Sequence, residues 1–347
     1  MKPPLKQLAI TDKIRSEINA GLYSGGQRMP TEAEYSAAFG VSRQTVRRAL
    51  STLEVEGLIT RRQGSGSYAN TVSGTHVRTG RIAVICTYIS EYIFPSILRG
   101  IENVTNDNGY QLVMNSTNNS IAAERDILFR LFENPVDGII VEGTKTALPN
   151  PNGEFYSTLA GRGIPIVFIN SFYPDITGGN VIHIVTDDYA GGYTSAARMI
   201  HAGHRSICGI FKSDDIQGTH RYAGYTDALI QLGAKMCDNN VIWFSTETKE
   251  LLVRSIGDFI MGIEHDCTGV VCYNDQIAAH VVRFFEDSSE YSVRAVASFD
   301  ACLPITSSRL DFVSYPHPKE RLGTVAATKL FSMIAGHKED SVVFPWE

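Results

Sequence analysis

The chain has 347 residues, of which 43% are hydrophobic and 20% are charged. These values describe an ordinary globular protein of two or three domains with a sizeable core. No run of 18 apolar residues occurs, which excludes a transmembrane helix, and the first residues, MKPPLKQLAI, lack the apolar stretch of a secretory signal. We therefore expect a cytoplasmic protein that does not associate with membranes.

The net charge of −6 is distributed unevenly along the chain. Residues 1–70 contain ten Lys and Arg against six Asp and Glu, whereas residues 71–347 contain 21 against 31. A basic head on an acidic body indicates an anionic partner for the head alone.

The six cysteines are scattered, with no CxxC pair and no clustered histidines beside them. This pattern argues against a metal site and against a disulfide framework. We expect most of them to be small buried thiols, and no motif indicates a cofactor.

Three helices are predicted in the head. Ile10, Ile14, Ile18 and Leu22 recur every four residues and form the apolar stripe of the first helix. The second runs over residues 32–39, where Thr31 and Glu34 have the spacing of a capping box and Gly40 ends the helix.

The third helix begins in the run VSRQTVRRAL, residues 41–50, with Ser42 as its N-cap, and it ends at Gly57. Its apolar residues share one face, while Arg43, Gln44 and Arg47 lie on another. A short turn followed by a helix with polar donors in its first turn is typical of a helix-turn-helix, whose second helix enters the major groove of DNA. Alternatively, these arginines form only a solvated face.

A hairpin is predicted after the third helix, with residues 58–60 pairing with residues 67–69 and RRQGSG at the tip. Arginines beside glycines allow a close approach to phosphates. Three helices followed by such a hairpin make a winged helix-turn-helix.

The run QRMPTEAEYSAAFGVSRQTVRRALSTLEVEGLITRRQGSGSYA resembles the GntR family of bacterial transcription factors. The resemblance implies that the third helix contacts bases and phosphates and that the wing tip reaches the minor groove. Many members carry an arginine where this chain has Ala33. The expected DNA-binding residues are Thr31, Glu32, Ser42, Arg43, Gln44, Thr45, Arg47, Arg48, Arg61, Gln63 and Gly64.

We expect three parts: a winged helix-turn-helix over residues 1–70, a linker over 71–80 that is rich in Gly, Ser and Thr, and a body over 81–347. In the body, apolar runs rich in β-branched residues alternate with helical segments, which predicts an α/β fold with parallel sheets covered on both faces. The length predicts two similar lobes. The expected strands lie within residues 81–89, 110–115, 136–143, 164–171, 181–187, 205–211, 241–245, 268–274 and 294–300.

Ligands of open α/β sheets bind beyond the carboxyl ends of the strands. The segments that follow these strands are rich in carboxylates, amides and aromatic rings, with one arginine, a set that suits the hydroxyls and C–H face of a sugar. The segments are residues 88–94, 115–118, 142–145, 170–173, 187–188, 212–221, 245–246, 274–275 and 300.

Two runs of the body, HAGHRSICGIF…GTHRYAGYTDAL and VVCYNDQIAAH…VASFD, resemble the sugar-sensing domain of the LacI family, which is related to periplasmic sugar-binding proteins. The resemblance implies a two-lobed effector domain in which Arg221 grips sugar hydroxyls, with Asn274 and Asp300 as polar clamps and Phe94 lining the pocket. The expected effector-binding residues are Tyr88, Phe94, Glu142, Lys145, Asn170, Asp188, Arg221, Asn274, Asp275, Asp300 and His317.

Several of these residues also have structural interpretations. Arg221 is either a pocket residue or a surface residue of its helix, and Asp275 either binds ligand or caps a helix. Glu142 needs a partner, either Lys145 or a ligand hydroxyl. His317 either reaches the ligand or only stiffens a hinge between the lobes.

The segments TYISEYIFPSILRGIE, NSTNN and CYND, together with the combination of the two parts, resemble the arabinose-responsive repressors. The resemblance implies a homodimeric repressor on a palindromic double-stranded operator, released by a small sugar, either L-arabinose or a close pentose. One alternative is a regulator of the same architecture that responds to another sugar, or to a nucleoside or purine as co-repressor. Another is a sugar-modifying enzyme, but no GxGxxG, GxxxxGK[ST] or GxSxG motif follows a strand and no catalytic triad is apparent.

Overall fold

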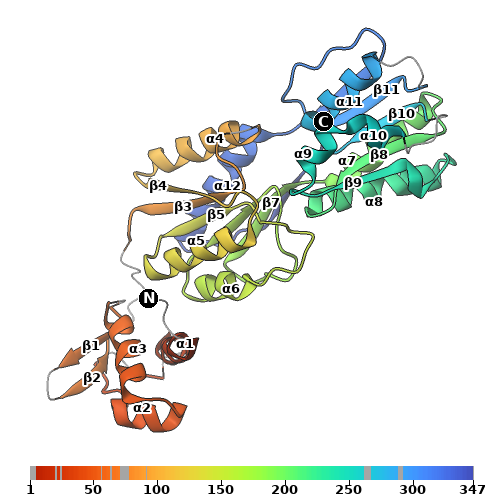
Figure 1. Ribbon diagram of the computed structural model, residues 1–347. Coiled ribbons are helices and arrows are strands. Elements are labelled where there is room, and N and C mark those ends of the chain that lie inside the picture. Colours follow the sequence, from red (N-terminus) through yellow and green to blue (C-terminus); the bar gives the residue numbers. More distant parts are fainter. Residues whose placement is uncertain are drawn as a thin grey trace. The chain divides into compact units, whose positions relative to one another are not determined.

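A computed structural model describes residues 5–19, 22–23, 26–55, 57–62, 65–70, 78–90, 92–261, 267–287 and 292–346. The chain divides into two compact units, residues 1–77 and 78–347 (Figure 1). Within the described ranges, none of the helices combines the length and apolar character needed to cross a membrane.

The first unit contains three helices and a hairpin, as predicted. The helices are α1 (Leu5–Asn19), α2 (Glu32–Phe39) and α3 (Arg43–Val55), and the hairpin pairs β1 (Ile59–Arg62) with β2 (Gly66–Ala69). Ile10, Ile14 and Ile18 are buried in its core, whereas Leu22 lies beyond the end of α1 and is 64% exposed.

The predicted caps are confirmed. The Thr31 hydroxyl accepts a hydrogen bond from the Glu34 amide, and the Glu34 carboxylate accepts one from the Thr31 amide. Gly40 ends α2 at φ 62°, a left-handed conformation that glycine adopts without steric cost. Ser42 Oγ accepts from the Thr45 amide at the start of α3. These caps fix where α3 begins, and with it the direction of its first turn.

The second unit has two α/β lobes. The first lobe has a six-stranded parallel sheet in the order β13-β7-β6-β5-β3-β4. Its strands are β3 (Arg81–Cys86), β4 (Gln111–Ser116), β5 (Gly138–Val141), β6 (Ile166–Ile169), β7 (Val181–Thr186) and β13 (Val342–Phe344). Helices α4 (Phe94–Asp107) and α12 (Lys319–Ile334) cover one face, and α5 (Ile121–Glu133) and α6 (Gly153–Gly161) cover the other (Figure 1).

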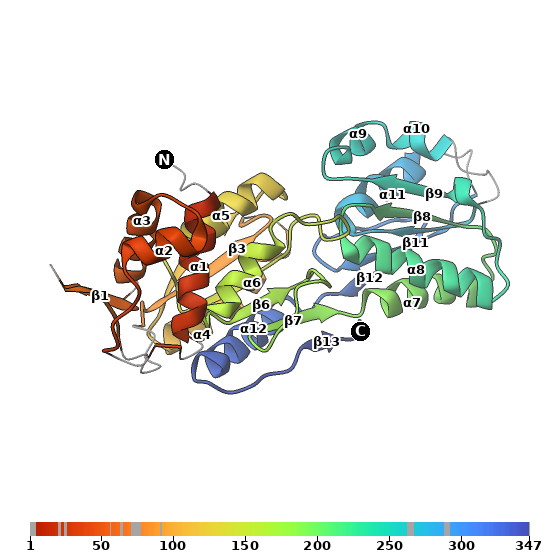
Figure 2. The same cartoon turned by 90° about the horizontal axis from the view of Figure 1, so that it is seen from below.

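The second lobe has a five-stranded parallel sheet in the order β12-β11-β10-β8-β9. Its strands are β8 (Ile207–Lys212), β9 (Val241–Phe244), β10 (Gly269–Cys272), β11 (Ala295–Asp300) and β12 (Asp311–Pro316). Helices α7 (Asp188–His201) and α8 (Ile216–Gln231) pack on one face (Figure 2). The other face is covered by α9 (Lys249–Arg254), α10 (Ile256–Met261) and α11 (Asp275–Asp287), and a 3-10 turn (Asp238–Asn240) precedes β9.

The chain crosses between the lobes from β7 to α7 and again from β12 to α12. His317 lies in the second crossing, where the sequence predicted it. Strands β12 and β13 were not predicted. Both are edge strands with half-exposed residues, so neither shows the continuous apolar run of a central strand.

The cysteines depart from expectation in one respect. Cys208 of β8 and Cys267 form a disulfide although 59 positions separate them in the sequence, so the expectation of thiols is wrong for this pair. The two residues meet because β8 and β10 are neighbouring strands, a pairing that no local pattern reveals. Cys86 and Cys272 are buried thiols, as expected.

Candidate DNA-binding and effector sites

The first turns of α3 present the polar side chains that were predicted to contact DNA. Arg43, Gln44, Arg47 and Arg48 are exposed, while Val46, on the opposite face, is fully buried in the core of the first unit. The apolar face of α3 thus packs in the core of the first unit, and its basic face is left accessible.

Glu32 links the recognition helix to the hairpin. Its carboxylate accepts hydrogen bonds from Arg47, with 2.8 Å between Nη2 and Oε2, and from Arg61 of β1, with 2.7 Å between Nη2 and Oε1. The hydrogen bond from Arg47 is the main cause that lowers the pKa of Glu32. The carboxylate therefore orients two guanidinium groups, one from each element expected to contact DNA.

Three other predicted DNA-binding residues lie at the starts of α2 and α3. Thr31 caps α2, and Ser42 and Thr45 join their hydroxyls at the start of α3, 2.8 Å apart. Gln63 and Gly64, predicted for the wing tip, lie outside the described residues. Their contact with DNA stays a prediction.

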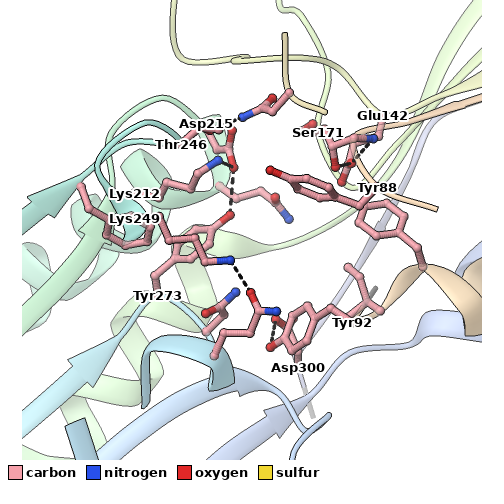
Figure 3. Close-up of a pocket in the computed structure, with 18 of the residues that line it drawn as sticks. Tyr88, Tyr92, Glu142, Ser171, Lys212, Asp215, Thr246, Lys249, Tyr273 and Asp300 are labelled. Atoms are coloured by element: carbon pink, nitrogen blue, oxygen red, sulfur yellow. Dashed lines mark hydrogen bonds and ion pairs between the residues drawn. The ribbon is translucent and has the colours of Figure 1, made fainter. Parts of the chain in front are cut away.

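A cavity lies between the two lobes of the second unit and is lined by side chains of both. The carboxyl ends of strands from both sheets supply its walls, as expected for open α/β sheets. Figure 3 shows Tyr88, Glu142 and Ser171 on one side of the cavity and Lys212, Lys249 and Tyr273 on the other.

Arg221 of α8 lines this pocket although it is only 2% exposed, so it is not a surface residue of its helix. Its Nε and Nη2 donate to Asp188 Oδ1, each at 2.8 Å, and its Nη1 donates to the Tyr273 carbonyl. The ring of Phe299 lies 4.3 Å from the guanidinium carbon. The guanidinium is thus held at its edges by hydrogen bonds and at its face by an aromatic ring. A guanidinium fixed in this way is preorganised to form two hydrogen bonds with the hydroxyls of a ligand.

Glu142 is the buried carboxylate of the first lobe. It accepts hydrogen bonds from the backbone amide and the hydroxyl of Thr87. It also accepts one from Asn170 Nδ2 at 3.0 Å. Burial raises the pKa of Glu142 to about 7, and the hydrogen bonds from Thr87 and Asn170 oppose this rise. Lys145, which the sequence offered as its partner, pairs instead with Glu247 of the other lobe.

The charges that face the cavity are balanced. Lys212 pairs with Asp214 and Asp215, and Lys249 donates to the side chain of Gln276. The wall as a whole contains three cations, Lys212, Arg221 and Lys249, and three carboxyl groups, Glu142, Asp215 and Asp300. A neutral polar ligand fits this wall better than a phosphorylated one, which would need uncompensated cations.

The two lobes are joined by hydrogen bonds beside the pocket. Tyr92 Oη donates to Asp300 Oδ2 at 2.7 Å and accepts from the Asp275 amide at 3.1 Å, and Asn119 Nδ2 donates to Thr246 Oγ1. Asp300 has a φ of 93°, a strained conformation of the kind concentrated at functional sites. Each of these hydrogen bonds joins a residue of the first lobe to a residue of the second.

The structure brings six of the eleven predicted effector-binding residues to the wall of this cavity: Tyr88, Phe94, Glu142, Arg221, Asn274 and Asp300. The other five do not line it. Asp188 accepts a hydrogen bond from Arg221, and Asn170 donates one to Glu142, so both contact wall residues without lining the cavity. Lys145 forms an ion pair with Glu247 of the other lobe.

Asp275 and His317 are the remaining two. His317 is buried in the lobe crossing, where its ring lies 5.7 Å from that of Trp346, and it does not line the cavity. Asp275 is fully buried and accepts from Ser298, Ser314 and two backbone amides, so it stabilises the second lobe. The cap that was considered for Asp275 comes from Asn274, whose Oδ1 accepts from the Ile277 amide.

Some wall residues were not selected from the sequence. Tyr92, Lys212, Asp215, Gln217 and Thr246 lie in the segments that follow the strands but were not singled out within them. Asn119, Phe244, Lys249, Tyr273 and Gln276 lie outside those segments. Lys249 and Gln276 lie in the first turns of α9 and α11, so predicted starts for these two helices could have indicated both residues.

Comparison with known proteins identifies both units. The sequence pattern of bacterial regulatory proteins of the gntR family matches residues 6–68. The pattern of periplasmic binding proteins and the sugar binding domain of the LacI family matches residues 79–307.

Similarity to single proteins extends over nearly the whole chain. The "Arabinose metabolism transcriptional repressor" of Halalkalibacterium halodurans is 33% identical over 95% of this chain and 90% of its own length. The protein of that name from Geobacillus stearothermophilus is 34% identical over 97% of this chain and 93% of its own. Transcription regulator CcpA of Lactococcus lactis has the same fold, with a TM-score of 0.64 and 22% identity over 78% of this chain and 97% of its own.

The winged helix-turn-helix, joined to a two-lobed domain with an interlobe pocket, defines a DNA-binding transcriptional regulator controlled by a small molecule. The chain belongs to the family of the arabinose metabolism transcriptional repressors.

Proposed function

We propose that this repressor binds L-arabinose in the interlobe pocket and leaves its operator as a result. The observation that carries the proposal is the buried guanidinium of Arg221, which faces a cavity with balanced charge and polar side chains from both lobes. Relatives at 33–34% identity that are named for arabinose metabolism support the choice of sugar. The protein would act in the cytoplasm, where the operator is.

We further propose that the chain acts as a homodimer. A palindromic operator has two half-sites about one helical turn, or a multiple of it, apart, and two copies of the first unit would occupy them. The second unit would supply the dimer contact. Residues of α3 and of the hairpin, including Arg43, Arg47 and Arg61, would contact bases and phosphates.

The energy required of the sugar is moderate. To change operator occupancy from almost full to almost none, it must prefer the released state by about 10⁴-fold, or about 5.5 kcal/mol. Two sites in a dimer would each supply about 3 kcal/mol. Several charge-assisted hydrogen bonds, donated by Arg221 and accepted by Asp300 and Glu142, are sufficient for that.

The test combines calorimetry with operator release. L-arabinose, D-xylose, D-galactose and adenine are titrated into the full chain, and release of a labelled operator is followed by fluorescence anisotropy. We expect L-arabinose to bind, to release the operator and to be recovered unchanged, which separates a repressor from a sugar-modifying enzyme. Adenine would instead strengthen operator binding if the effector were a purine co-repressor.

Arg221→Ala should bind the operator normally and fail to release it with sugar. Arg125→Ala is the matched control, because Arg125 is an exposed residue of α5 that packs on Phe155, away from the pocket. Normal release by Arg221→Ala would contradict the proposed effector site.

A further inference from the structure

The end of the chain connects the two lobes a third time. Strand β13 extends the sheet of the first lobe by pairing with β7, and the Phe344 carbonyl accepts a hydrogen bond from the Asp187 amide at 2.8 Å. Two residues later, Trp346 packs against the hydrophobic core of the second lobe. A strand fixed to one lobe thus places its next large side chain in the other.

Trp346 contacts the residue on which the proposed effector site depends. Its ring lies 5.0 Å from the guanidinium carbon of Arg221 and 5.0 Å from the ring of Phe299. The α7 helix has Gly191 beside the indole, where a Cβ would lie 2.7 Å from Trp346 Cδ1. The second lobe therefore leaves a space for this ring that any other residue at position 191 would fill.

The surroundings of Arg221 make an aromatic contact effective. His317, whose ring lies 5.7 Å from that of Trp346, is neutral because burial and the charges of Arg221 and Lys319 lower its pKa to about 3. Trp346 and Phe299 offer the guanidinium aromatic rings in a desolvated site, where a cation–π contact is worth most. Asp188 and the Tyr273 carbonyl hold its edges.

We propose that Trp346 is a positioning residue of the effector site, which holds the Arg221 guanidinium and makes its position depend on the angle between the lobes. The inference rests on the proposed function in one respect, that Arg221 binds the effector. Trp346 follows a strand of the first lobe, whereas Arg221 belongs to the second. When the lobes open, the indole moves relative to the guanidinium and the site loses part of its preorganisation.

The first experiment measures L-arabinose affinity of the full chain by calorimetry. Trp346→Ala should bind about tenfold more weakly, because a guanidinium without this contact must be ordered by the sugar itself. Trp346→Phe should stay within about twofold of the unchanged protein. Gly191→Ala keeps the tryptophan but fills its space, so we expect the same weakening. Val343→Ala is the control, because Val343 is an exposed residue of the same strand.

The second experiment uses the fact that the chain contains two tryptophans, Trp243 and Trp346. In Trp243→Phe, the emission of Trp346 should shift when L-arabinose is added. In Trp346→Phe, the emission of Trp243 should not shift, because Trp243 is 40% exposed and packs on Phe211 and Tyr222, whereas Trp346 packs on Arg221.

The third experiment needs no sugar. The Nε–H signal of Arg221, identified by its loss in Arg221→Lys, should exchange with solvent faster in Trp346→Ala than in Trp346→Phe, with thermal unfolding confirming that both are folded. Equal exchange rates would overturn the positioning role, as would unchanged sugar affinity of Trp346→Ala. Failure of L-arabinose to bind the unchanged protein would count against the proposed effector only, since the exchange measurement still tests Trp346.

Discussion

Arg221 and Asp188 form a buried ion pair, with 2.8 Å between Nη2 and Oδ1. Asp188 is the first residue of α7, directly after the chain crosses from the first lobe, and Arg221 lies in the second turn of α8. The two helices approach closely because Gly192 has no Cβ: one built there would lie 2.0 Å from the Arg221 carbonyl oxygen. The ion pair therefore joins the lobe crossing to the pocket wall.

Asp188→Asn should destabilise the protein and weaken sugar binding. Removing one partner of a buried pair leaves an uncompensated charge and costs about 3–5 kcal/mol. We expect a loss of that order in the free energy of unfolding, measured with urea at pH 7. Asp227→Asn, which removes a carboxylate that binds Tyr189 on the same pair of helices, should cost less than about 1 kcal/mol. Equal losses in the two variants would contradict the special role of the pair.

The fold could be predicted largely from local patterns. The caps of α2 and α3 and the apolar runs of the central strands are short-range signals, and each predicted the element that the structure contains. The edge strands β12 and β13 lack such a signal, because most of their residues are exposed or only partly buried. The disulfide between Cys208 and Cys267 depends on the pairing of β8 with β10, and no local sequence pattern indicates which strands become neighbours.

The site could be predicted less completely. The rule that ligands bind at the carboxyl ends of strands located the wall, and with it Glu142, Arg221 and Asp300. It does not distinguish a residue that faces the cavity from one that supports it from behind, as Asp188 does. That distinction depends on side-chain direction and on packing between helices, neither of which has a sequence period. Trp346 reaches Arg221 only because β13 pairs beside the lobe crossing.

Arg43→Ala should weaken operator binding and leave the sugar site unchanged. Arg43 is exposed in the first turn of α3, and loss of a base or phosphate contact of this kind costs about 1–3 kcal/mol. Anisotropy at several salt concentrations measures both the affinity and its salt slope, which falls by about one if the contact is to phosphate. Arg125→Ala serves again as the control, and a loss of L-arabinose affinity in Arg43→Ala would show that the two sites are not separate.

Sugar binding should weaken as the pH falls through 7. The pKa of Glu142, raised to about 7 by burial, means that its carboxylate gains a proton near neutrality and can no longer accept a hydrogen bond from a ligand hydroxyl at both oxygens. Between pH 8.5 and 6.5 we expect the affinity for L-arabinose to fall about fourfold. Calorimetry at three pH values measures this change. Glu142→Gln should bind more weakly and lose most of this dependence, keeping only a small fall at pH 6.5, because burial raises the pKa of Asp300 to about 6. An unchanged fourfold fall in the variant would assign the effect elsewhere.

Glu247→Gln should lower sugar affinity only slightly. Glu247 pairs with Lys145 across the lobes, but its side chain is 63% exposed, and exposed ion pairs contribute about 0–1 kcal/mol. We expect L-arabinose affinity to fall by no more than about fivefold, with the difference disappearing at 1 M NaCl. Glu250→Gln breaks an exposed pair within α9 and should have no effect. A larger loss of L-arabinose affinity that persists at 1 M NaCl would show that the ion pair does more than join the two lobes.

His317 should make the protein less stable in acid. Burial, together with the nearby charges of Arg221 and Lys319, lowers the pKa of His317 to about 3, against about 6.5 in an unfolded chain. Between these values the unfolded state binds the extra proton, so the free energy of unfolding falls as the pH falls, by up to about 1.4 kcal/mol per pH unit. His317→Gln lacks this proton. Urea unfolding at pH 7 and pH 5 should therefore show the stability of the unchanged protein falling, relative to His317→Gln, by about 2 kcal/mol. His337→Gln, at an exposed position after α12, should keep the behaviour of the unchanged protein. If the difference between the unchanged protein and His317→Gln were the same at both pH values, the imidazole would not be buried in its neutral form at the lobe crossing.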